Sequence, residues 1–135
     1  AYQTRLGETA IPRDDSVALV TSLRGRVRQY VVSNGTVQAQ TAKLRRSGLD
    51  RLMDGIFLSE RIGAEKPDIA FFDAVFAAIG PVAKEEVLIV GDSLTSDIQG
   101  GKNAGIQTCW YAPAGGESPL PHHTIRDLHE VLALL

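Results

Sequence analysis

Short apolar runs alternate with longer amphipathic segments along most of the chain. Two runs rich in β-branched residues, 27–33 (VRQYVVS) and 87–91 (VLIVG), each stop at Gly or at a small polar residue. Such runs are typical of strands that are buried on both faces of a parallel sheet. Segments 55–59 and 106–111 carry the same pattern more weakly and predict two further strands.

The segments between the predicted strands show helical spacing. We expect a helix over 37–47 that stops at Gly48, because glycine is common just after a helix C-terminus. A second helix is predicted over 69–79, with Asp68 as its N-cap, and a short amphipathic helix over 125–135. This alternation predicts right-handed βαβ units, and therefore an α/β fold with a doubly wound parallel sheet between two layers of helices.

Two segments depart from this alternation. Residues 112–123 (APAGGESPLPHH) are rich in Gly and Pro, which indicates a surface loop. Residues 1–13 show no strand pattern, and we expect them to be the tail of a structural unit whose beginning precedes the sequence. Residues 14–135 are then expected to form the core.

Composition limits the classes of function. The 135 residues suit one domain, and 14 Lys and Arg against 16 Asp and Glu argue against an electrostatic nucleic-acid binder. The single cysteine, Cys109, excludes an intrachain disulfide and a multi-cysteine metal site, and it suits a reducing compartment. No apolar run approaches the ~20 residues that span a bilayer, and no signal peptide begins the chain. We therefore expect a soluble, cytoplasmic protein with no membrane partner.

Polar residues that could bind a ligand or take part in catalysis directly follow the predicted strands. Ligands of an open parallel sheet bind beyond the carboxyl ends of its strands, so these positions are informative. Asp92 and Asp97 could offer two oxygen ligands to Mg²⁺, which is held by one or two carboxylates together with water and phosphate oxygens. The alternative is that both aspartates cap the helix that follows them.

The other two strand-end segments suit an anion. Ser33, Asn34 and Gly35 offer a hydroxyl, an amide and backbone N–H groups to a phosphate, although Ser33 or Asn34 could instead cap the next helix. Lys66 could supply a positive charge to a phosphate, or it could be a solvated surface lysine. The agreement of three such signals at one sheet edge favours a functional site.

These segments together resemble the haloacid dehalogenase (HAD) superfamily of phosphohydrolases. VVSNG is similar to its second motif, EKPD to its third and GDSLTSD to its fourth, and the resemblance covers about 12–135. The fragments GLDRLMDGIFLSERIGAEKPDIAFFDAV and GDSLTSDIQGGKNAGIQTCWY are most similar to the branch that includes pyrimidine-type 5′-nucleotidases. The resemblance implies a HAD-like, Rossmann-like core.

The resemblance also implies a reaction and a role for each motif residue. The reaction is Mg²⁺-dependent hydrolysis of a small phosphomonoester, such as a nucleoside 5′-monophosphate, through an aspartyl-phosphate. Ser33 would bind the phosphate and Lys66 would neutralise it. Asp92 would be a direct Mg²⁺ ligand, and Asp97 a supporting acid in the metal site.

One expected part has no counterpart in the sequence. The first motif of the family is an Asp-x-Asp pair after the first, central strand, and the acidic pair Asp14-Asp15 is adjacent rather than alternating. We therefore expect a sheet that lacks this strand and most of its helical cap, with unpaired edges facing each other across a gap. The chain would be the C-terminal part of a longer enzyme, inactive alone, with the nucleophile supplied by a missing N-terminal segment or by another chain.

Other interpretations remain open. The chain could be a non-catalytic binding or assembly module, whereas a dinucleotide-binding domain is disfavoured because no strand is followed by G-x-G-x-x-G. His122 and His123 are read as solvated loop residues, and Cys109 and Trp110 as packing residues of a buried strand. The aromatic residues of the helix over 69–79 are expected in the core, namely Phe71, Phe72 and Phe76.

Overall fold

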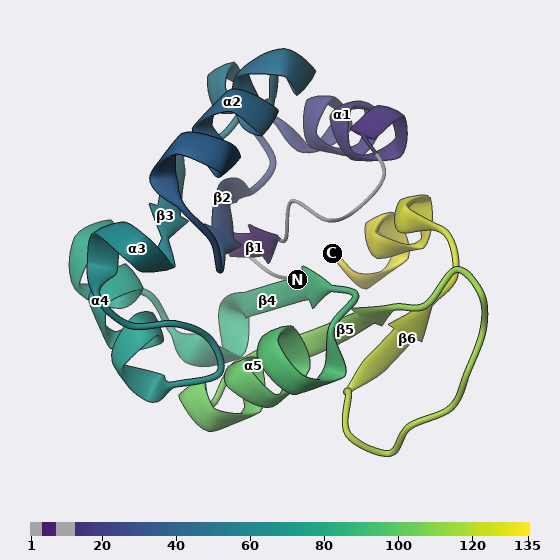
Figure 1. Cartoon of the computed structure of the whole chain (residues 1–135). Coiled ribbons are helices and arrows are strands. Elements are labelled where there is room, and N and C mark those ends of the chain that lie inside the picture. The colour runs from purple at the N-terminus through teal and green to yellow at the C-terminus, as the bar shows by residue number, and fades with distance from the viewer. Residues whose placement is uncertain (1–3, 8–12) are drawn as a thin grey trace.

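A six-stranded parallel sheet with the strand order β3-β2-β1-β4-β5-β6 forms the centre of the molecule (Figure 1). This computed structural model describes residues 4–7 and 13–135, without the side chains of residues 7 and 13–16. The strands are β1 (Thr4–Gly7), β2 (Arg28–Ser33), β3 (Gly55–Leu58), β4 (Val87–Gly91), β5 (Gln107–Tyr111) and β6 (His123–Ile125). The helices are α1 (Arg13–Leu23), α2 (Val37–Ser47), α3 (Ser59–Ile62), α4 (Ile69–Ile79) and α5 (Gln99–Ala104).

The elements with the strongest sequence patterns lie where they were predicted. Helices α2 and α4 and strand β4 have the predicted bounds, and β2, β3 and β5 differ from the predicted runs by one terminal residue each. Gly48 ends α2 with a φ of 81°, in the left-handed region that favours glycine. The α/β class and the doubly wound parallel sheet are confirmed.

Helices cover the sheet on both faces, so β4 is buried along its whole length and β2 at every residue but the first. Ile89 of β4 and Val32 of β2 pack with Phe71 and Phe72 of α4 in one core cluster. Leu88 and Val90 of β4 point to the other face, where they pack with residues of α1 and of the C-terminal segment. Phe76 is half-buried beside the first cluster, whereas Phe71 and Phe72 are fully buried. No helix among the described residues is long and apolar enough to cross a membrane.

The C-terminal region differs from its prediction in two ways. Residues 123–125 form β6, which pairs with β5, so the Gly- and Pro-rich loop ends one residue earlier than expected. The predicted amphipathic helix over 125–135 is a shorter 3-10 helix over Leu128–Leu134. Asp127 caps it by accepting from the backbone N–H of His129, and Glu130 accepts from the backbone N–H of Asp127. This capping box begins the helix later than the apolar pattern indicated.

The prediction of a gap at the centre of the sheet is wrong. Strand β1 lies between β2 and β4 and pairs with both in parallel, with Leu6 opposite Tyr30 on one side and Ile89 on the other. Residues 4–7 of the predicted cap tail therefore belong to the sheet, while residues 1–3 and 8–12 lie outside the described part. The division into a cap tail over 1–13 and a core over 14–135 otherwise stays a prediction.

The sequence of β1 is unusual for a central strand because it buries polar side chains. Thr4 is fully buried and Arg5 is 3% exposed. One guanidinium N–H of Arg5 donates to Gln29 Oε1 at 3.3 Å, whereas Arg5 Nε and Thr4 Oγ1 have no hydrogen-bond partner among the described residues. Burial lowers the pKa of Arg5 to about 10, an effect partly opposed by the Cys109 thiol. Strand β1 therefore fills the centre at an electrostatic cost.

Replacement of Arg5 by leucine tests this placement of β1. We expect R5L to stabilise the protein by roughly 1–2 kcal/mol, because removing a buried charge that has no acidic partner among the described residues outweighs the loss of one hydrogen bond to Gln29. Urea unfolding followed by circular dichroism measures the change. R61L, at the exposed Arg61 of α3, is the control and should change stability by less than about 0.5 kcal/mol. Equal effects of the two variants would contradict the placement.

Candidate active site

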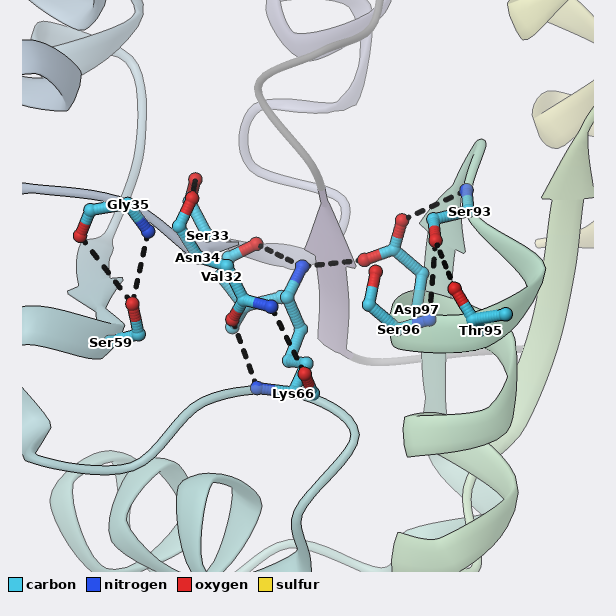
Figure 2. Close-up of polar contacts among 10 residues, drawn as sticks. All are labelled: Val32, Ser33, Asn34, Gly35, Ser59, Lys66, Ser93, Thr95, Ser96 and Asp97. Atoms are coloured by element: carbon cyan, nitrogen blue, oxygen red, sulfur yellow. Dashed lines mark hydrogen bonds and ion pairs between the residues drawn. The ribbon is translucent and has the colours of Figure 1, made fainter.

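Three loops meet at the carboxyl edge of the sheet, and the Lys66 ammonium on one of them contacts Val32 and Asp97 (Figure 2). The first loop follows β2 and holds Ser33, Asn34 and Gly35. The second precedes α4 and holds Lys66, and the third follows β4 and leads to Asp97. The structure therefore brings the predicted residues of all three motifs to one edge, as parallel strands do with residues at their carboxyl ends.

Lys66 and Asp97 form a buried ion pair. The distance from Lys66 Nζ to Asp97 Oδ1 is 2.5 Å, and neither side chain is exposed. Lys66 Nζ also donates to the carbonyl oxygen of Val32 at 3.0 Å, and the backbone N–H of Ser93 donates to Asp97 Oδ2 at 3.2 Å. The solvated-lysine interpretation of Lys66 is wrong, because both charges are removed from water and compensated by each other.

Asn34 holds the backbone of Lys66 rather than pointing into solvent. The backbone N–H of Lys66 donates to Asn34 Oδ1 at 2.9 Å, and Asn34 Nδ2 donates to the carbonyl oxygen of Lys66 at 3.0 Å. The amide thus satisfies both backbone groups of the lysine (Figure 2). Asn34 was predicted as a phosphate-binding residue, and that role stays a prediction. The observed contact makes it a positioning group for Lys66.

The backbone around Gly35 is also engaged within the protein. The N–H of Gly35 donates to Ser59 Oγ at 3.0 Å, and the N–H of Val37 donates to Glu60 Oε1 at 3.0 Å. Thr36 is the N-cap of α2 and accepts from the N–H of Ala39, so neither Ser33 nor Asn34 caps this helix. Ser59 directly follows β3, and the rule that singled out the other strand ends would have found it.

Ser33 ends β2 and is fully buried. Its hydroxyl is 3.4 Å from the carbonyl oxygen of Asn34, which is long for an O–H donor. The preceding residue, Val32, accepts the hydrogen bond from Lys66 Nζ. The predicted phosphate-binding hydroxyl thus lies one residue away from a carbonyl that holds the predicted phosphate-neutralising ammonium.

The two aspartates of the fourth motif lie in different environments. Asp92 is exposed, and its backbone carbonyl accepts from Trp110 Nε1 at 3.1 Å. Asp97 is buried against Lys66. The motif therefore offers one accessible carboxylate, and this fits Mg²⁺, which needs one or two carboxylates when water and phosphate oxygens complete its coordination. The described residues contain no cluster of three or more His, Cys, Asp or Glu side chains that could hold a metal alone.

Residues considered for other roles lie elsewhere in the fold. Cys109 is buried in β5, and burial raises the pKa of its thiol to about 12, so it packs as an unreactive side chain. Trp110 is half-buried rather than fully buried. His122 binds β5 through Nδ1, which accepts from the N–H of Thr108 at 3.1 Å and lies 2.8 Å from Thr108 Oγ1. It is thus a structural contact of the loop before β6.

Comparison with known families assigns this arrangement to one of them. Residues 1–105 match the family described as "Hydrolase: haloacid dehalogenase-like hydrolase". Pyrimidine 5′-nucleotidase YjjG of Escherichia coli is 35% identical over all of this chain and 61% of its own length. N-acylneuraminate-9-phosphatase of Rattus norvegicus is 34% identical over 98% of this chain and 54% of its own. The chain thus spans about half to three fifths of the length of these relatives.

A solved structure supports the same assignment. The magnesium-bound crystal structure of the HAD-hydrolase YfnB from Bacillus subtilis superposes with a TM-score of 0.86 at 39% identity. The superposition covers 90% of this chain and 55% of that one. The shared fold at this level of sequence identity points to common descent.

Removal of the Asn34 side chain tests its hold on Lys66. N34A would leave the N–H and C=O of Lys66 without these partners, and we expect a loss of about 1–3 kcal/mol in the free energy of unfolding. Amide hydrogen exchange at Lys66 should accelerate in the folded state. N103A is the matched control. Exposed Asn103 donates a hydrogen bond to the carbonyl oxygen of Pro67, the residue that follows Lys66. Equal rates of amide hydrogen exchange at Lys66 in N34A and N103A would refute the positioning role of Asn34.

The contact of His122 predicts a pH dependence of stability. Burial and the nearby Lys102 and His123 lower the pKa of His122 in the folded state, and Nδ1 must be unprotonated to accept from Thr108. The unfolded chain therefore binds the proton more readily, so this contribution is present above pH ~6.5 and is lost as the pH falls below it. Thermal unfolding between pH 7.5 and 5.5 should show a smaller decrease for H122N than for wild type. An equal decrease for H122N and wild type would contradict this role of His122.

Proposed function

The chain belongs to the haloacid dehalogenase-like hydrolase family, and we propose that it carries the phosphate-binding and metal-binding half of a Mg²⁺-dependent phosphomonoesterase. The observation that carries this proposal is the convergence of Ser33, Lys66 and Asp97 at one sheet edge, with exposed Asp92 ending the adjacent strand. The names of two relatives, pyrimidine 5′-nucleotidase and N-acylneuraminate-9-phosphatase, suggest a small phosphorylated substrate such as a nucleoside 5′-monophosphate.

Each residue has a physically distinct task in this proposal. The Ser33 hydroxyl donates a hydrogen bond to a phosphoryl oxygen, and the Lys66 ammonium offsets the charge of the phosphate. Asn34 and Asp97 fix the backbone and the ammonium of Lys66, so that its charge is already oriented before substrate arrives. Bound Mg²⁺, held by Asp92, would supply further neutralisation of the phosphoryl oxygens.

The reaction itself is a two-step transfer. A carboxylate oxygen forms a bond to phosphorus as the ester P–O bond breaks, and the leaving oxygen takes a proton to become an alcohol. Water then attacks the phosphorus of the aspartyl-phosphate, which releases inorganic phosphate and restores the carboxylate. Ser33 and Lys66 hold the phosphoryl group in line during both steps.

The nucleophile is proposed to come from outside these 135 residues. The sequence contains no Asp-x-Asp pair, and the strand at the centre of the sheet reads Thr4-Arg5-Leu6-Gly7. A segment that carries an Asp-x-Asp strand, in the same polypeptide or in another one, would take the place of β1 between β2 and β4. The buried and poorly paired Arg5 favours such a replacement.

A second function follows if β1 stays in place. The sheet is then complete and its central strand carries no carboxylate, which favours a non-catalytic module that binds phosphate esters without hydrolysing them. Both functions use Ser33 and Lys66 as phosphate ligands. Only the first function predicts hydrolysis of the bound phosphate ester, so an assay of hydrolysis distinguishes the two.

A chimera provides the test. The 135-residue chain and a fusion to the amino-terminal half of YfnB are assayed for phosphate release from uridine 5′-monophosphate, with and without Mg²⁺. We expect no turnover from the chain alone and Mg²⁺-dependent turnover from the fusion. In the fusion, D92N and K66M should each lower kcat by at least about 100-fold, because each removes charge compensation at the phosphoryl group.

D73N, at an exposed carboxylate of α4, controls for the loss of one negative charge and should leave kcat unchanged. Turnover by the chain alone would contradict an external nucleophile. Full activity of the D92N fusion would contradict the metal role of Asp92. A folded fusion that binds but never hydrolyses the substrate would favour the non-catalytic module.

A further inference from the structure

We propose that the opposite, amino edge of the sheet carries a second anion site, which binds a compact polyanion through Arg24, Arg26 and Arg28. These arginines line a surface hollow of about 530 Å³ together with Gln29, Leu52 and Asp54. The hollow lies between the loop that joins α1 to β2 and the segment that leads into β3. Its volume is within the range of small-molecule sites.

The three guanidinium groups are available to a ligand. Each arginine is exposed, and no described carboxylate forms an ion pair with any of them. A guanidinium presents several N–H donors in a planar fork, which matches the oxygens of phosphate and carboxylate groups. Three such forks around one hollow suit a ligand with several anionic groups.

Hydrogen bonds hold the wall of the hollow, and one of them engages its acidic residue. The backbone N–H of Gln29 donates to Asp54 Oδ2 at 2.7 Å, and the N–H of Asp54 donates to the carbonyl oxygen of Gln29 at 2.7 Å. The Gln29 side chain is buried and donates to the carbonyl oxygen of Val20 at 3.0 Å. Its Oε1 accepts from Arg5, so a fourth, buried positive charge lies directly behind the wall. Arg5 therefore adds to the positive potential that an anion would meet.

The charge of this region contrasts with that of the chain. Residues 24–54 contain seven Lys and Arg and two acidic residues, whereas the whole chain has 14 Lys and Arg against 16 Asp and Glu. The segment of the chain that forms the hollow therefore carries a positive surplus. A macromolecular polyanion would need an extended basic face, whereas the arginines here surround one hollow, which favours a small ligand.

This site is separate from the proposed catalytic one. Strand β2 begins at Arg28, in the hollow, and ends at Ser33, at the carboxyl edge. The same strand therefore joins the two edges, and a polyanion on one edge would not compete directly with a phosphate ester on the other.

Titration of the 135-residue chain with inorganic tripolyphosphate, followed by ¹H–¹⁵N chemical shifts, tests the proposal. We expect the largest shifts at the amides of Arg24 to Gln29 and of Asp54. The double variant R26Q/R28Q should weaken binding at least tenfold. R45Q/R46Q is the matched control, because it removes two exposed charges from the same basic region at the end of α2, outside the hollow, and should change affinity less than twofold.

Parallel titrations with citrate and with a single-stranded DNA 12-mer identify the ligand chemistry. Citrate binding with the same shift pattern would extend the site to polycarboxylates, whereas preference for tripolyphosphate would assign it to phosphates. Shifts confined to Ser33, Gly35 and Lys66 would overturn the proposal, since they would report the catalytic edge alone. Equal weakening by the two double variants, or tighter binding of the DNA, would also overturn it. The shift map of the wild-type chain decides the outcome even if R26Q/R28Q is unstable.

Discussion

The buried ion pair between Lys66 and Asp97 is the interaction on which the candidate site depends. Moving both charges out of water is costly, and the pair is tolerable because hydrogen bonds saturate it: Lys66 also donates to a strand carbonyl, and Asp97 accepts from a backbone N–H. The ion pair therefore requires three loops from distant parts of the chain to meet in one arrangement. Gly91, at the end of β4, belongs to the same constraint, because a Cβ at that position would collide with the Asp97 carboxylate.

Sequence reasoning succeeded where a local pattern determines the structure. Helices α2 and α4 were predicted with their observed bounds because an amphipathic run ends at a glycine in each. Strands β2 and β4 were predicted because continuous β-branched runs are buried on both faces of the sheet. Strand β1 was missed for the opposite reason. Its four residues include Thr4 and Arg5, whose burial no periodicity indicates.

The position of the candidate site in the fold was predictable from the sequence, but the hydrogen bonds of its residues were not. The strand-end rule put Ser33, Lys66 and Asp97 at one edge, since it needs only the order of strands and helices. The partner of each polar atom depends on loop conformation, which local sequence does not encode. Asn34 thus holds the backbone of Lys66, and Thr36 caps α2 in place of the two residues considered for that role.

The positive side chain of the candidate site is buried at the carboxyl edge of the sheet, whereas the arginines of the hollow are exposed at the amino edge. This difference bears on which anions each edge can bind. At the carboxyl edge, the Lys66 ammonium is buried and already paired with Asp97, so in the proposed function it would offset only part of the charge of a phosphate. Phosphate binding at this edge would need a further cation, which agrees with the dependence on Mg²⁺ proposed above. At the amino edge, three exposed arginines have no described acidic partner, so an anion meets a net positive surface. A metal-free anion should therefore favour the amino edge, whereas a phosphate ester with Mg²⁺ should favour the carboxyl edge.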